Sequence, residues 1–176
     1  MSFKNVPTGK NPPTDVNVIV ENPMGGDPVK YEVDKESGVM FVDRFLHTSM
    51  RYPGNYGYIP NTLSGDGDPV DVLVVTSVPV MPGAVLRSRP IGVLRMVDDA
   101  GEDEKIVAVP VAKLFPYHDN VEDIEDLRPI LRDQIEHFFK HYKDLEKGKW
   151  SEVKGWGNAE EAGRLIIEGI ERAKTK

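Results

Sequence analysis

Three carboxylates within six residues, Asp66, Asp68 and Asp71, form the segment best suited to chemistry. Each negative charge raises the cost of ionising its neighbours, so such a cluster needs a cation. A hard divalent ion with oxygen ligands, such as Mg²⁺, meets that need. Asp and Gly are also common in polar turns, but a turn that only leads into a strand seldom needs three acids. The spacing therefore favours a metal site.

A second acidic segment, residues 98–104, contains five acids among seven residues. By itself it is better explained as a solvated hairpin loop. Each acidic segment adjoins an expected strand, so both could meet at one end of a barrel and supply ligands for more than one Mg²⁺. Two metal ions about 4 Å apart can polarise a phosphoryl group and acidify a bridging water. Together the two segments indicate chemistry on phosphorus.

Four cations and one tyrosine elsewhere in the chain have the chemistry to bind an anion opposite these acids. Arg binds phosphate through two parallel hydrogen bonds, and Lys acts as a point charge. Taken singly, each cation is more simply explained as a surface residue, and the tyrosine as a core aromatic. The set consists of Lys30, Arg44, Lys105, Tyr142 and Lys143.

Length and composition narrow the class of protein. The chain is long enough for one domain with a sizeable core, so we expect a single domain over residues 1–176. Its 29 acidic residues exceed the 22 basic ones, which argues against a nucleic-acid partner. The absence of cysteine excludes disulfides and thiolate chemistry. Because neither a signal peptide nor an apolar run of about 20 residues is visible, we expect a cytoplasmic protein without a membrane partner.

Short strands and turns are predicted for the first 112 residues or so. Segments that are β-branched or alternate between apolar and polar residues predict strands. The segment 51–61 is rich in Tyr, Pro, Gly and Asn and is predicted to be a structured loop. A further strand is expected from the acidic motif through Val78. The other expected strands cover residues 16–21, 29–33, 39–44, 85–97 and 105–109.

Helical periodicity begins after this region. Apolar residues recur every three or four positions over residues 127–145, with Pro129 in the first turn and Gly148 at the end. A second helix is expected to begin at Asn158, with Glu161 completing a capping box. Strands first and helices last predict an α+β fold. We expect a closed or partly closed antiparallel barrel, with about two major C-terminal helices packed on its outside.

The acidic motif of residues 66–71 also shares features with known loops of different function. An EF-hand loop starting at Asp66 needs Gly at its sixth position, where Asp71 stands, and no P-loop consensus occurs. Residues 66–70 do fit the Asp-x-Asp-x-Val pattern of phosphatases that form an aspartyl-phosphate. In those enzymes the nucleophile follows an apolar strand of a βαβ unit, whereas here the apolar run follows the motif. A non-catalytic OB-type module that binds nucleic acid or calcium is a further hypothesis, disfavoured by the acidic charge.

Residues 66–72, Asp-Gly-Asp-Pro-Val-Asp-Val, resemble the signature of the family I soluble inorganic pyrophosphatases. The resemblance extends over nearly the whole chain, and the compact length is similar to that of the bacterial type. It implies a five-stranded OB-like barrel with flanking helices, and a homohexamer. The other matching motifs are Lys30-Tyr31-Glu32, Val42-Asp43-Arg44, Tyr52-Pro53, Asn55-Tyr56-Gly57-Tyr58, Gly101-Glu102-Asp103 with Lys105, and His141-Tyr142-Lys143-Asp144-Leu145.

This resemblance implies Mg²⁺-dependent hydrolysis of inorganic pyrophosphate to two orthophosphates without a covalent intermediate. A metal-activated water would attack, with Asp68 as its general base. Several Mg²⁺ ions per subunit are implied, and the sequence leaves substitution by Mn²⁺ or Zn²⁺ open. The implied direct metal ligands are Asp66, Asp71 and Asp103, with Asp98 for a further ion.

The resemblance also implies which side chains bind the substrate and which support them. Asp99 stands where related bacterial enzymes carry Glu, so one acid near the expected site is shorter. The residues implied for the two phosphates are Lys30, Arg44, Tyr56, Tyr142 and Lys143. Those implied for outer metal or water positions are Glu21 and Glu32, and those in supporting positions are Tyr52 and Lys105.

Overall fold

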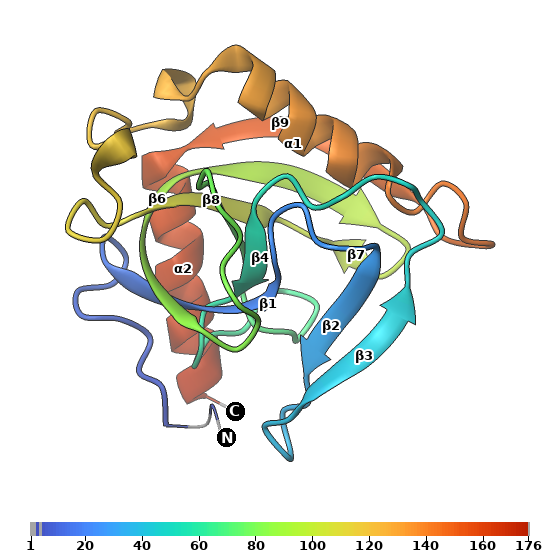
Figure 1. The fold of residues 1–176 in the computed structure, drawn as a ribbon. Helices are drawn as coiled ribbons and strands as arrows, with labels where there is room; N and C mark the ends of the chain where they lie inside the picture. Colours follow the sequence, from blue (N-terminus) through green and yellow to red (C-terminus); the bar gives the residue numbers. More distant parts are fainter. Residues whose placement is uncertain (1–2, 4, 176) are drawn as a thin grey trace.

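Five strands of the computed structural model close into a ring at the centre of the molecule (Figure 1). In order around the ring they are β1 (Val16–Asn22), β4 (Asn55–Tyr58), β5 (Asp71–Val74), β8 (Lys105–Pro110) and β6 (Val85–Asp98). Each strand pairs with the next, and β6 pairs with β1 to close the ring. The structure describes residue 3 and residues 5–175. The ring confirms the predicted five-stranded barrel.

Closure depends on the length of β6, which has 14 residues. Its first part pairs with β1 and its middle with β8. Its last part pairs with β7 (Gly101–Glu102) and β9 (Ser151–Asn158). The pairing with β8 shifts register between Pro90 and Gly92, where Pro cannot donate to a strand ladder. One long strand therefore connects most of the sheet.

The pairing of β5 with β8 is parallel, whereas the other four pairings of the ring are antiparallel. The chain between these two strands contains β6 and β7 and no crossover helix. Because Val72 pairs with Ile106, the first residues of the two strands, Asp71 and Lys105, emerge at the same edge. This one parallel pair brings the acidic motif beside the second acidic segment.

A separate two-stranded sheet stands beside the ring, as Figure 1 shows. It is a hairpin of β2 (Val29–Val33) and β3 (Met40–Phe45), which correspond to the strands predicted at residues 29–33 and 39–44. Its turn is closed by Asp34, whose side chain accepts hydrogen bonds from both the N–H and the hydroxyl of Ser37, at 2.7 and 2.6 Å. The hairpin is thus a defined element that can present side chains to the ring.

Two helices complete the fold, α1 (Pro129–His141) and α2 (Ala159–Lys174). Two short 3₁₀ helices, Pro116–His118 and Ile124–Asp126, precede α1. The N-cap of α2 is as predicted, since the Asn158 side chain accepts from the Glu161 N–H at 3.0 Å. No helix within residues 5–175 has the length and apolar character to cross a bilayer.

Several local predictions were wrong. The predicted loop 51–61 contains β4, and the strand expected to reach Val78 ends at Val74. Strand β9 lies between the helices, where none was expected, and α1 ends at His141 instead of near Gly148. For the two unpredicted strands, β4 and β9, tertiary pairing outweighs local composition. Strand β4, for example, exists because it pairs with β1 on one side and β5 on the other.

Buried apolar side chains form two clusters, one for each helix. Along β5 the side chains alternate, so Leu73 belongs to one cluster and Val72 to the other. Helix α1 contributes Phe138 and Phe139 to the Leu73 cluster, whereas α2 contributes Ile166 to the Val72 cluster. The two helices therefore fix opposite faces of the same strand.

Replacement of Gly57 by Ala should destabilise the ring by about 3 kcal/mol or more. A Cβ at this position would lie 1.9 Å from the Ile19 carbonyl oxygen, where the backbones of β4 and β1 pair. Urea unfolding measures the loss. The matched control is Gly65→Ala, since a Cβ there meets nothing within 4 Å, and we expect it to change stability by less than about 0.5 kcal/mol. Equal effects of the two substitutions would contradict this account of the ring.

Candidate active site

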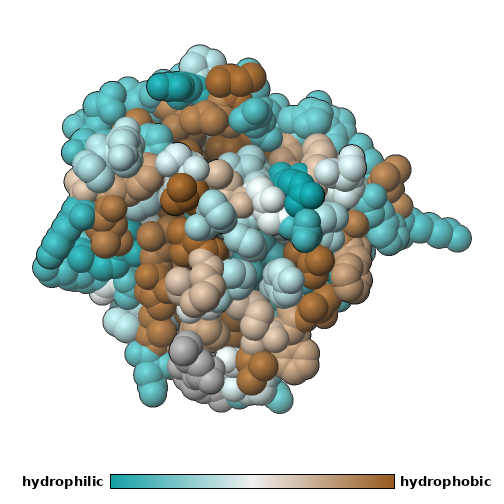
Figure 2. Space-filling model, viewed as in Figure 1, coloured by the Kyte–Doolittle hydropathy of each residue, from teal (hydrophilic) through white to brown (hydrophobic). Residues whose placement is uncertain are grey.

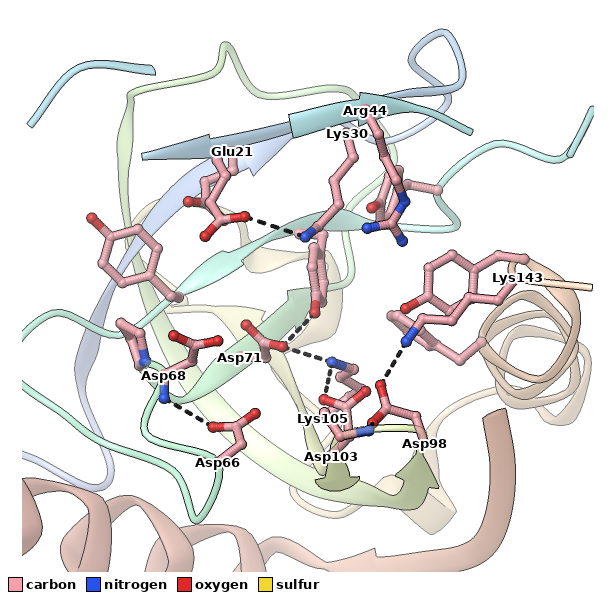
Figure 3. Close-up of a pocket in the computed structure, with 18 of the residues that line it drawn as sticks. Glu21, Lys30, Arg44, Asp66, Asp68, Asp71, Asp98, Asp103, Lys105 and Lys143 are labelled. Carbon is pink, nitrogen blue, oxygen red and sulfur yellow. Dashed lines mark hydrogen bonds and ion pairs between the residues drawn. The ribbon is translucent and has the colours of Figure 1, made fainter. Parts of the chain in front are cut away.

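One cavity of about 300 Å³ brings together the fourteen residues to which the resemblance assigned a role, whereas Asp99, Glu102 and Glu104 of the second acidic segment do not line it (Figure 3). Seven carboxylates and six cations line it, together with three tyrosines of the predicted set. The structure thus places the chemistry-bearing residues of separate segments at one location. The predicted residues that line the cavity are Glu21, Lys30, Glu32, Arg44, Tyr52, Tyr56, Asp66, Asp68, Asp71, Asp98, Asp103, Lys105, Tyr142 and Lys143.

Most of the acids come from the edge where β5 and β8 begin. Asp66 and Asp68 belong to the connection between β4 and β5, which we call the acid loop (residues 59–70). Asp71 is the first residue of β5, and Asp98 is the last residue of β6. Asp103 lies between β7 and β8. The closed ring therefore gathers these carboxylates, although they are up to 37 residues apart.

Lys105 lies between two of these acids. Its ammonium nitrogen is 2.6 Å from Asp71 Oδ2 and 2.5 Å from Asp103 Oδ1, and its side chain is only 4% exposed. Burial by itself would lower the pKa of Lys105, but the neighbouring acidic groups, Asp71 first, outweigh it and the pKa lies well above the usual value. Lys105 therefore remains charged and compensates the repulsion between Asp71 and Asp103.

Two tyrosines extend this network into the core. The Tyr56 hydroxyl donates to Asp71 Oδ2 at 2.6 Å, and burial raises the Tyr56 pKa well above its usual value, so the proton stays on the phenol. The Tyr52 ring stacks on Tyr56 with centroids 5.3 Å apart. The Tyr52 hydroxyl is buried, lines the cavity and has no hydrogen-bond partner among the described residues. It is a donor available to a ligand.

The β2–β3 hairpin supplies cations from the opposite side of the cavity (Figure 3). Lys30 and Arg44 are cross-strand partners, and both contact Asp43 Oδ2, at 3.1 and 3.0 Å. Arg44 Nε also lies 2.7 Å from Glu146 Oε1. The end of α1 adds Lys143, which binds Asp98 Oδ2 at 2.6 Å. An anion between the two sides would therefore meet positive groups held in place by acids.

Lys143 and Asp98 form a largely buried ion pair, with side chains 9% and 10% exposed. Partial burial raises the pKa of Asp98, but the hydrogen bond from Lys143 and the Ala100 N–H lower it to below the usual value. Asp98 is therefore ionised at neutral pH. The pair connects the end of α1 to the end of β6 and fixes the positions of both.

Glu21 is the most deeply placed acid of the site. It lies on β1, is 7% exposed, and its Oε1 accepts from the Val33 N–H at 2.8 Å. Burial raises the pKa of Glu21 to about 8, against the effect of that hydrogen bond. In this structure Glu21 therefore carries a proton at neutral pH.

Three further polar residues of the cavity were missed by the sequence analysis: Lys35, Tyr58 and Lys149. Lys35 forms an ion pair with Asp68, and Lys149 Nζ lies 2.7 Å from Asp99 Oδ2. Lys35 and Lys149 belong to turns, where strand or helix periodicity does not predict the direction of a side chain. Tyr58 belongs to the unpredicted β4, and recognising that strand would have placed it near Tyr56. Asp99, the shorter acid, thus has a cationic partner at the edge of the site.

The donor atoms of this cavity fit Mg²⁺. Its carboxylates offer only oxygen atoms as metal ligands, and neither Cys nor His lines it. Such a set of ligands favours a hard cation over a soft one. Within residues 5–175, no three acids or histidines already converge into a ready ligand set. Lys105 instead provides the positive charge between Asp71 and Asp103.

The family model described as inorganic pyrophosphatase matches residues 18–174. The chain belongs to this family. It is 65% identical over 170 residues to the inorganic pyrophosphatase of Rhodospirillum rubrum, covering 97% of this chain and 95% of that protein. It is 60% identical over 176 residues to the inorganic pyrophosphatase of Escherichia coli strain K12, covering all of both chains. These identities place it among the family I pyrophosphatases of the bacterial type.

The fold of this pyrophosphatase also matches a solved relative. The crystal structure of inorganic pyrophosphatase from Thermus thermophilus superimposes with a TM-score of 0.93 at 39% identity, over 99% of each chain. The family hydrolyses inorganic pyrophosphate and depends on Mg²⁺. An aspartyl-phosphate phosphatase of βαβ type does not fit the acid loop, which joins two antiparallel strands, β4 and β5.

The stability of the metal-free pyrophosphatase should fall with rising pH because of Glu21. Its raised pKa means that the folded state, but not the unfolded one, binds a proton between pH 4.5 and about 8. The free energy of unfolding therefore decreases through that window. Glu21→Gln retains the Oε1 acceptor and lacks the titration. We expect the variant to exceed the wild type in stability by about 3 kcal/mol at pH 7 and by much less at pH 5.

Urea unfolding in the presence of a chelator, at several pH values and one protein concentration, measures this difference. A difference between wild type and variant that is the same at pH 5 and pH 7 would show that Glu21 does not carry the proton.

Proposed function

We propose that this pyrophosphatase cleaves pyrophosphate in the described cavity by direct attack of a water, with Asp68 as the general base. The observation that carries the proposal is the meeting of carboxylates from the strand ends with Lys, Arg and Tyr from the hairpin and α1. Asp68 suits a base because its side chain is 65% exposed to the cavity and solvent. Among the described residues, it forms an ion pair only with Lys35. A proton acceptor must reach the water that it deprotonates.

The cations of the hairpin and the end of α1 are proposed to bind the two phosphates. Lys30 and Arg44 are 25% and 29% exposed, so their charged ends can reach a ligand while Asp43 holds them. Tyr142 and Lys143 would bind from the other side. Tyr56 donates to Asp71 here, so a bond from Tyr56 to a phosphate would replace or share that contact. These residues orient the anhydride and balance its charge.

The charge of the cavity supports a need for metal ions. With Glu21 protonated, six ionised carboxylates face six cations, so pyrophosphate would enter a site with no net positive charge. We propose that Mg²⁺ is bound by Asp66, Asp71 and Asp103, with Asp98 for a further ion and Glu21 and Glu32 in outer positions. Bound Mg²⁺ neutralises phosphate charge and lowers the pKa of the attacking water. Several ions per subunit, and replacement by Mn²⁺ or Zn²⁺, belong to the same proposal.

Phosphate release from pyrophosphate should require Mg²⁺ and should depend on Asp68. We expect a chelator to abolish turnover, and Asp68→Asn to lower kcat by about 10²- to 10⁴-fold because it removes the proton acceptor. A matched control is Asp27→Asn, since Asp27 is 82% exposed, pairs with Arg51 and lies outside the cavity. Colorimetric measurement of phosphate gives both rates.

Turnover that survives chelation, or wild-type kcat in Asp68→Asn, would overturn the proposed mechanism. An aspartyl-phosphate would leave radioactive phosphate on the acid-quenched protein after reaction with labelled pyrophosphate, and we expect none. Tight oligonucleotide binding at low salt without hydrolysis would instead favour an OB-type binding module.

We further propose that the chain acts as one domain, in the cytoplasm, and as a homohexamer. Apolar side chains gather over the hairpin on the face shown in Figure 2. Four apolar side chains of the hairpin, those of Val39, Phe41, Val42 and Phe45, are half exposed or more, and a surface of this kind is often covered by a partner. Light scattering after gel filtration should give six times the chain mass of 19.7 kDa. A mass equal to one chain would contradict the hexamer.

A further inference from the structure

We propose that α2 positions the catalytic acids through Arg172 and Gly169, which hold the acid loop at Leu63. The inference rests on the proposed function, since it assigns to α2 the placement of Asp66 and Asp68. Neither Arg172 nor Gly169 lines the active-site cavity. Their effect on the reaction must therefore pass through the loop, which makes them positioning residues.

Both backbone polar groups of Leu63 are bound by α2. The Arg172 guanidinium donates from Nη1 to the Leu63 carbonyl oxygen at 2.6 Å, and the Leu63 N–H donates to the Gly169 carbonyl oxygen at 2.9 Å. Arg172 and Leu63 are 109 residues apart in sequence. Figure 3 shows the helix passing beneath the loop that carries Asp66 and Asp68. A hydrogen bond from a charged donor is stronger than one between neutral groups, so this contact can restrain a loop.

Gly169 allows the helix to approach this closely. A Cβ at residue 169 would lie 2.8 Å from Val70 Cγ2 and 3.2 Å from the Leu63 carbonyl oxygen. It would therefore press on the acid loop at Leu63 and at its last residue, Val70. No positive φ is needed at this residue, so the requirement is for space between helix and loop.

Hydrogen bonds transmit the position of Leu63 to the catalytic acids. The next residue, Ser64, donates its N–H to the Asp68 carbonyl oxygen at 2.6 Å. The Asp68 N–H in turn donates to Asp66 Oδ1 at 2.9 Å. At the base of the loop the Val70 N–H donates to Thr62 Oγ1 at 3.0 Å. Because Ser64 follows Leu63 in the chain and binds Asp68, a shift at Leu63 would move the backbone of Asp68.

A second arginine on the same helix provides a matched control. Arg164 Nη1 and Arg172 Nη2 both pair with Glu168, at 2.9 and 3.3 Å. No hydrogen bond joins Arg164 to the acid loop among the described residues. Arg164→Met and Arg172→Met thus remove similar ion pairs from one helix face, but only the second removes the contact to Leu63.

Arg172→Met should lower kcat for pyrophosphate about tenfold relative to Arg164→Met, with KM changed less than about twofold. The reason is that a displacement of about 1 Å in a catalytic group can cost up to 10²-fold in rate, whereas the phosphate-binding cations on the hairpin and α1 stay in place. Arg172→Lys retains a donor and should recover part of the rate. Gly169→Ala moves the same loop by bulk and should also lower kcat.

Hydrogen exchange provides a readout that does not depend on activity. In metal-free protein, amides of residues 64–70 should exchange about tenfold faster in Arg172→Met than in Arg164→Met, and peptides of β1 and β6 should not differ. Equal exchange and equal kcat in the two variants would overturn the role of α2.

If wild type fails to hydrolyse pyrophosphate, the proposed function is wrong, and the exchange experiment still decides whether α2 holds the loop. Faster exchange throughout the chain in Arg172→Met would mean general destabilisation and would also overturn the proposal, unless Gly169→Ala confines the change to residues 64–70.

Discussion

Repulsion among carboxylates crowded into one small cavity is the constraint on which the structure of this pyrophosphatase depends. Like charges at such separations cannot all ionise without compensation. The protein compensates them in three ways: Lys105 lies between Asp71 and Asp103, Lys143 pairs with Asp98, and Glu21 carries a proton. The carboxyl and ammonium groups involved can still bind a metal ion or a phosphate. The site is therefore stable as a protein structure and still suited to bind both.

The ring of strands makes this crowding possible. Five strands closed on themselves bring chain segments from residues 16 to 110 to one edge, and the parallel pair of β5 and β8 sets Asp71 beside Lys105. The β2–β3 hairpin is outside the ring, so its cations approach from a separate element. Acids and cations on different elements can be held apart at a fixed distance, which leaves space for a substrate between them.

The two helices support different parts of the site. Helix α1 ends at the cavity and places Tyr142 and Lys143 there, while its aromatic side chains pack against Tyr52 and Tyr56. Helix α2 lies on the other cluster of the core and contacts the acid loop from outside the cavity. The cavity is thus supported from both core clusters, by α1 through one and by α2 through the other. A site of many coupled charges needs such support, because small displacements change every pairwise interaction.

The amino-acid sequence was sufficient to predict the family of this protein and the reaction, hydrolysis of inorganic pyrophosphate. Acid spacing in residues 66–71, together with the motifs resembling pyrophosphatases, identified fourteen residues that the structure gathers in one cavity. Periodicity also located both strands of the hairpin and both helices, and the capping-box pattern located the N-cap at Asn158. These features are local, so a few neighbouring residues reveal them.

The way in which those residues act together depends on the tertiary structure. The strands β4 and β9, the ion pairs of Lys35 and Lys149, and the protonation of Glu21 all depend on partners far away in the chain. The contact of Arg172 with Leu63 joins residues 109 positions apart. Burial and pairing of this kind arise only when the ring closes, and no local pattern of residues encodes them.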